Sequence, residues 1–222
     1  MKFTLRNYGL SIVLLFFFLS FWIGQAIVGR LEYNEEREDR GLPALAMNEY
    51  LHSSHFWEAT GENWESEFLQ MGAYVFLTAF LFQKGSSESK DPDEESPQDK
   101  DPREEQNKPD APWPVHRGGW VLKIYENSLV LAFASLFIGA LIMHAAGGVR
   151  LYNEEQIALG KQAICFSEYL QTTRFWFESL QNWQSEFLAM GAMVVLSIFL
   201  RQRGSPESKP VAASIAQTGD ED

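Results

Sequence analysis

The chain has 222 residues and a formal net charge of -12, from 18 basic and 30 acidic side chains. This acidic balance argues against nucleic-acid binding, which needs a basic surface. A single cysteine, Cys165, excludes an intramolecular disulfide and any metal site built from several cysteines.

The first apolar stretch covers residues 10–29 and carries no charge. At about 1.5 Å per residue, a helix of this length crosses the roughly 30 Å of bilayer hydrocarbon. Lys2 and Arg6 before an apolar run are also typical of a cleavable signal peptide. The run is long for such a peptide and no A-x-A site closes it, so we expect a retained transmembrane helix.

The polar segment after this helix contains an amphipathic pattern. Helical spacing places five side chains on one face, namely Met47, Tyr50, Leu51, Ser54 and Trp57. The same spacing recurs in the second half of the chain, in Phe166, Tyr169, Leu170, Thr173 and Trp176. The pattern predicts an amphipathic helix in each of the two outer loops, resting on the outer leaflet or capping the bundle.

A second apolar helix is expected over residues 64–83. Its uncharged part, 68–83, would cover only about 24 Å, which is less than the hydrocarbon layer needs. Extending the helix back to Trp64 restores the length, makes Asn63 the N-cap and places a tryptophan at the outer interface.

A linker follows over residues 84–122, rich in Pro, Ser and acidic residues. Such a segment cannot bury enough apolar surface to offset its ordering entropy, so we expect it to be disordered. The same composition predicts a disordered tail over 210–222.

The chain then repeats itself at an offset of 119 residues. Residues 7–90 align with 126–209 without a gap, and about 35 of the 84 pairs are identical. An internal duplication explains this agreement, with repeat 1 over 1–83 and repeat 2 over 123–209. Repeat 2 is expected to hold apolar helices over 127–149 and 183–202.

The predicted fold is an all-α membrane protein with four transmembrane helices. They form two parallel two-helix repeats, because each repeat crosses the membrane twice and both enter in the same direction. The N-terminus, the linker and the C-terminal end hold 12 Lys and Arg when Lys123, Arg201, Arg203 and Lys209 at the adjoining helix ends are included, and the two inter-helix loops hold 6. The positive-inside rule therefore places both termini in the cytoplasm.

Four polar side chains are candidates for a polar or cation site: Glu67, Glu186, Gln25 and His144. The two glutamates lie about one turn inside their helices. There they either interact with the positive helix end or form a cation or proton site shared between the repeats. Gln25 and His144 occupy aligned positions and either hydrogen-bond to a neighbouring helix or bind a ligand.

Paired carboxylates also lie just outside the expected membrane, in two YNEE motifs. They are Glu35, Glu36, Glu154 and Glu155. These side chains either bind Ca²⁺ or another hard cation, or are simply solvated. Interfacial anchors are expected at Trp64, Trp183, Trp57 and Trp176. No cofactor is predicted.

The motif N-W-x-S-E-F-L-x-M-G-A begins at Asn63 and again at Asn182, with Y-N-E-E upstream and G-S-x-E-S-K downstream. This combination resembles a family of uncharacterised bacterial membrane proteins grouped as a domain of unknown function. The resemblance spans nearly the whole chain except the linker. It implies a location in the bacterial inner membrane and brings no activity with it.

The sequence carries no phosphate-binding loop, G-x-S-x-G elbow or HExxH motif. We expect a non-enzymatic integral membrane protein with a structural, partner-binding or lipid-binding role. Its expected partners are the lipid bilayer and either a second copy of the chain or another membrane protein. The alternative is a small channel or transporter with an outer carboxylate vestibule, and a third reading is a membrane enzyme acting on lipid.

Overall fold

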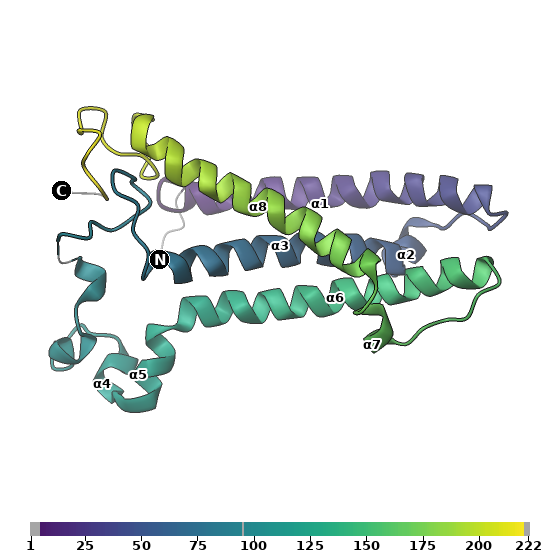
Figure 1. Cartoon of the computed structure of the whole chain (residues 1–222), viewed down its shortest axis with the longest axis horizontal. Coiled ribbons are helices and arrows are strands. Elements are labelled where there is room, and N and C mark those ends of the chain that lie inside the picture. The colour runs from purple at the N-terminus through teal and green to yellow at the C-terminus, as the bar shows by residue number, and fades with distance from the viewer. Residues whose placement is uncertain (1–4, 95, 220–222) are drawn as a thin grey trace. The chain divides into compact units, whose positions relative to one another are not determined.

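The computed structural model describes residues 5–94 and 96–219, which form helices and loops and, within these ranges, no strand (Figure 1). The elements in chain order are α1 (Leu5–Asp39), α2 (Met47–Tyr50), α3 (Ser54–Thr78), the 3₁₀ turns η1 (Pro97–Asp99) and η2 (Pro102–Glu105), α4 (Trp113–Arg117), α5 (Gly119–Glu126), α6 (Ser128–Ala158), α7 (Phe166–Tyr169) and α8 (Thr173–Phe199). The all-α prediction is confirmed over these ranges. Residues 1–4 of the expected first repeat and 220–222 of the expected tail lie outside them.

The chain divides into two compact units. Unit 1 comprises Met1–Glu62 and Leu141–Trp176, and unit 2 comprises Asn63–Ala140 and Phe177–Asp222. The boundaries fall within α3, α6 and α8.

Two helices are long and apolar enough to cross a membrane, over Asn7–Asp39 and Ser128–Ala158. Their large apolar side chains are widely exposed, as in Leu14 at 58% and Leu129 at 56%. Apolar surface on this scale suits an apolar environment, so the two helices favour association with a membrane. The other two expected spans do not stand out in this way among the described residues, since α3 ends at Thr78 and α8 at Phe199.

The predicted N-caps at Asn63 and Asn182 are wrong. Helix α3 begins at Ser54 and α8 at Thr173, so both asparagines lie inside helices. The starts are fixed by hydroxyl side chains that accept from the backbone. Ser53 Oγ accepts from Phe56 N at 3.3 Å, and Thr172 Oγ1 accepts from Phe175 N at 3.3 Å.

The prediction of one amphipathic helix in each outer loop is also corrected, because α3 and α8 begin within the pattern. The pattern is divided between a single turn, α2 or α7, and the first turns of α3 or α8. A non-helical break separates them, since the chain turns between Tyr50 and Ser54 and again between Tyr169 and Thr173.

Unit 1 is built around two clusters of buried side chains. The first cluster comprises Ala26, Tyr33, Tyr50, Phe56 and Leu151. The second cluster comprises Ala145, Tyr169 and Phe175. Each residue of the second cluster aligns with a residue of the first at the 119-residue offset.

The loop that follows each long helix of unit 1 is fastened in the same way. The Asn34 side chain donates to Leu45 O at 3.1 Å and accepts from Leu45 N at 2.8 Å. Asn153 makes the corresponding pair with Ile164, at 2.9 and 2.8 Å. Recurrence of local hydrogen bonds at this offset is what a duplicated unit predicts.

Unit 2 contains the linker and the tail, for which disorder is expected from sequence. In the structure the linker forms η1, η2, α4 and the start of α5. The tail folds around Lys209, whose ammonium is buried and donates to the carbonyls of Gly85 at 2.5 Å, Ile215 at 3.0 Å and Gln217 at 2.9 Å. Gly85 N also donates to Thr218 Oγ1 at 2.8 Å.

Candidate functional site

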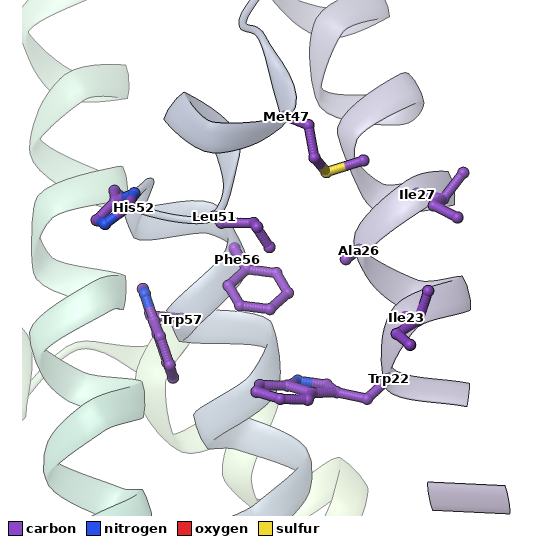
Figure 2. Close-up of a pocket in the computed structure, with 9 residues that line it drawn as sticks. All are labelled: Trp22, Ile23, Ala26, Ile27, Met47, Leu51, His52, Phe56 and Trp57. Atoms are coloured by element: carbon purple, nitrogen blue, oxygen red, sulfur yellow. The ribbon is translucent and has the colours of Figure 1, made fainter. Parts of the chain in front are cut away.

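An apolar pocket of about 500 Å³ lies in unit 1 between α1, α2 and the start of α3 (Figure 2). Its walls are formed by Trp22, Ile23, Ala26, Ile27, Met47, Leu51, His52, Phe56 and Trp57. The volume falls in the range of about 300–1,000 Å³ that is usual for small-molecule sites.

The pocket has almost no polar group to orient a ligand. Helix α1 supplies one wall, and Met47, Leu51 and Phe56 face it from the opposite side (Figure 2). The ring of Trp22 packs against Phe56 with centroids 6.0 Å apart. The Nδ1 atom of His52 is already used in a hydrogen bond, since it donates to Asn48 O at 2.7 Å. The occupant that fits is therefore hydrocarbon.

A group of aromatic side chains packs against Phe56, which is part of the pocket wall. Tyr50 Oη lies 3.1 Å from His55 Nδ1, and the His55 ring stacks on Tyr33 with centroids 4.5 Å apart. Burial lowers the pKa of His55, although the carboxylates of nearby Glu36 and Glu32 oppose the shift. Burial also raises the pKa of Tyr50 to about 12. Both groups are thus neutral near pH 7 and act as packing and hydrogen-bonding groups.

A second constellation in unit 1 brings two carboxylates to one imidazole. Glu58 and Glu62 lie one turn apart on α3, and His144 comes from α6. One potential ligand atom from each lies within 4.8 Å of the others. His144 is fully buried, and Glu58 is 7% exposed.

Of the four residues predicted to form a polar site, the structure divides the pairs between the units. Glu67 and Glu186 lie in unit 2, and Gln25 and His144 lie in unit 1. The Glu67 and Glu186 carboxylates are close enough to interact electrostatically. The Gln70 amide donates to the backbone oxygen of Glu186 at 3.1 Å.

Residues 1–220 match a domain of unknown function, DUF6766. The chain belongs to that family. Curated proteins and solved structures give no match. The DUF6766 description names no activity, so the function of this chain has to be argued from its geometry.

Most of the YNEE carboxylates are engaged by neighbouring side chains. Glu36 pairs with Arg40 at 3.5 Å, Glu154 accepts from Tyr33 Oη at 3.3 Å, and Glu155 pairs with Arg174 at 2.6 Å. Together with Glu35, they form no three-residue ligand group among the described residues.

The four tryptophans predicted as interfacial anchors differ in exposure. Trp57 and Trp176 are exposed, at 37% and 47%, whereas Trp64 and Trp183 are half-buried. Trp183 Nε1 donates to the buried carboxylate of Glu65 at 3.3 Å within unit 2. The indole N–H of Trp183 is therefore used in a hydrogen bond to a buried carboxylate.

Sequence reasoning singled out His144 but missed Glu58 and Glu62. The available signal was their spacing, because glutamates at i and i+4 share one helix face. Starting α3 at Asn63 removed that signal, since it left both residues in a loop.

Proposed function

We propose that this chain is a non-enzymatic, multi-pass membrane protein whose unit 1 binds a lipid acyl chain. In this proposal four helices cross the bacterial inner membrane as two parallel repeats, with both termini in the cytoplasm. Support comes from the two long apolar helices, the 119-residue duplication in sequence and the recurring loop hydrogen bonds.

The apolar pocket carries the lipid part of the proposal. Trp22 and Ile23 line it from α1, and residues 13–19 of that helix expose a series of large apolar side chains. An acyl chain that lies along these side chains and in the pocket contacts mainly apolar surface. Binding of this kind is driven by apolar area removed from water.

Photo-crosslinking in proteoliposomes tests the pocket. A phospholipid with a diazirine on one acyl chain should label peptides from α1 and from residues 47–57. Replacing Ile23 by Trp fills the pocket from a position that is 57% exposed, so the fold should tolerate it. We expect labelling of residues 47–57 to fall several-fold.

Ile142→Trp is the matched control. Ile142 aligns with Ile23, is exposed to 56% and does not line this pocket. Equal labelling of Ile23→Trp, Ile142→Trp and the wild type would contradict acyl-chain binding in the pocket.

A small channel or transporter is the second candidate, favoured by the Glu67 and Glu186 carboxylates. Like charges held near each other suit a site that attracts cations. Cation flux into proteoliposomes that decreases in both Glu67→Gln and Glu186→Gln would support this function. Flux equal to that of empty liposomes would exclude it.

A further inference from the structure

Glu58, Glu62 and His144 converge from two helices that are distant in sequence. The two glutamates lie on the first turns of α3, and the histidine lies in the second half of α6. Their ligand atoms lie within 4.8 Å of one another. Ligand atoms of a tetrahedral ion at about 2.0–2.2 Å lie about 3.4 Å from one another, so the side chains have to draw together wherever a pair is farther apart than this.

Burial strengthens the attraction of this group for a cation. Glu58 is 7% exposed, and Glu62, one turn later, is half-buried. Away from bulk water, two carboxylates on one helix face attract a divalent cation more strongly than they would at the surface. A neutral imidazole supplies a third ligand.

Gly147 fixes the approach of the two helices at this point. A Cβ at Gly147 would lie 2.7 Å from the backbone N and the Cβ of Glu58, so only glycine permits this contact. His144 precedes Gly147 by about one turn and therefore faces the same segment of α3. Its ring also stacks on Phe175, with centroids 5.1 Å apart. The imidazole is held in place from two sides.

The duplication supplies an independent observation. At the 119-residue offset, Glu58 aligns with Phe177, Glu62 with Gln181 and His144 with Gln25. Gly147 aligns with Val28. The aromatic core positions are kept in both copies, but the acids, the imidazole and the glycine occur together in one set only. A purely structural need common to both repeats does not explain this difference.

We propose that Glu58, Glu62 and His144 bind one divalent first-row transition-metal ion. Two carboxylate oxygens and one imidazole nitrogen suit Zn²⁺, Fe²⁺ or Mn²⁺. Ca²⁺ is disfavoured, because it takes six to eight oxygen ligands. Three protein ligands leave a coordination position for water or another ligand, and the ion ties α3 to α6 within unit 1.

Metal content and affinity of the full chain, purified in detergent after removal of any histidine tag, test this proposal. We expect about one transition-metal ion per chain by elemental analysis. After chelator treatment, titration with Zn²⁺ should restore one bound ion and raise the thermal midpoint of unfolding. Co²⁺ should give visible absorption typical of a site with nitrogen and oxygen ligands.

Two variants carry the residues found at the aligned positions. Glu62→Gln and His144→Gln should each weaken Zn²⁺ binding by more than about 100-fold, because loss of a direct ligand exceeds the 10–100-fold loss typical of its supporting groups. Glu38→Gln is the matched control, since this exposed glutamate of unit 1 lies on α1 and is not one of the three ligands. It should bind as the wild type does.

Two results would overturn the proposal. One is a chelator-treated wild-type chain that binds neither Zn²⁺ nor Co²⁺, which needs no variant to fold. The other is Zn²⁺ affinity equal to wild type in both Glu62→Gln and His144→Gln.

Discussion

Unit 1 contains two clusters whose apolar positions agree and whose polar partners differ. Tyr50 and Tyr169 each pack the hydroxyl group over a glycine of the preceding long helix, Gly29 in one case and Gly148 in the other. The residue five positions after each tyrosine differs. His55 hydrogen-bonds to Tyr50, whereas Arg174 pairs with Glu155. Packing thus sets the shared backbone, and the polar substitutions give each cluster its own chemistry.

The largest loss of stability is expected when the buried phenylalanine that both clusters share is replaced. Phe56 and Phe175 are 3% and 2% exposed. Phe56→Ala and Phe175→Ala should each lower the free energy of unfolding by about 3–5 kcal/mol, because both leave a cavity. Unfolding curves in mixed detergent micelles measure the loss. A large loss in only one variant would show that the two clusters are not equivalent.

Gly147→Ala should break a close helix contact at a glycine whose aligned position in the other repeat is Val28. Its Cβ meets backbone atoms of Glu58 that cannot rotate away, so we expect a loss of about 1–3 kcal/mol. Zn²⁺ affinity should fall as well. Gly139→Ala is the control on the same helix, since nothing lies within 4 Å of a Cβ there. The idea fails if the two alanine variants are equally stable.

Lowering the pH should reduce the stability that His55 contributes, whereas Arg174 should add no pH dependence. Burial lowers the pKa of His55, so below about pH 6.5 the unfolded chain binds the extra proton more readily. The contribution of His55 is complete above its unfolded pKa and is lost as the pH falls toward the folded one. The thermal midpoint should therefore decrease below about pH 6.5.

His55→Gln should remove part of this decrease, measured in a His144→Gln background so that the second buried imidazole does not contribute. Arg174 keeps its charge throughout the range and adds no slope. An unchanged pH profile in His55→Gln would assign the effect to other groups.

The smallest effect is expected at the ion pair between Arg174 and Glu155. Their side chains are 32% and 29% exposed, so solvent screens the attraction. Glu155→Gln should cost about 0.2–1 kcal/mol, and high salt should reduce the difference. A salt-independent loss of several kcal/mol would mean that the pair is more deeply desolvated than its exposure indicates.

The long apolar helices were predictable from sequence, because uncharged runs such as 10–29 and 127–149 have one plausible environment. The start of α3 was not. Its first turns mix aromatic and polar residues, and the cap that fixes them is a single hydroxyl, that of Ser53, next to a second serine, Ser54. The number of membrane crossings stays a prediction, because α3 and α8 carry acids near their middle and their apolar parts end at Thr78 and Phe199.

The candidate metal ligands were only partly predictable. His144 stands out as the one ionisable group within an apolar stretch. Glu58 and Glu62 were missed because comparison of the repeats favours residues present twice, and their aligned positions hold Phe177 and Gln181. A duplicated chain can acquire a site in one copy while the other keeps its apolar or amide residues. A comparison that looks only for residues shared by both repeats does not detect such a site.

The carbonyls gathered around Lys209 make its ammonium group the most connected attachment at the end of the chain. Gly85, Ile215 and Gln217 all direct their oxygens to this one group, as an ionophore directs its oxygens to a bound ion. Acetylation or loss of the ammonium group would leave these oxygens without their shared donor. The hydrogen bond from Gly85 N to Thr218 would remain, so we expect the segment around residues 210–219 to be cut faster by proteases while staying partly attached.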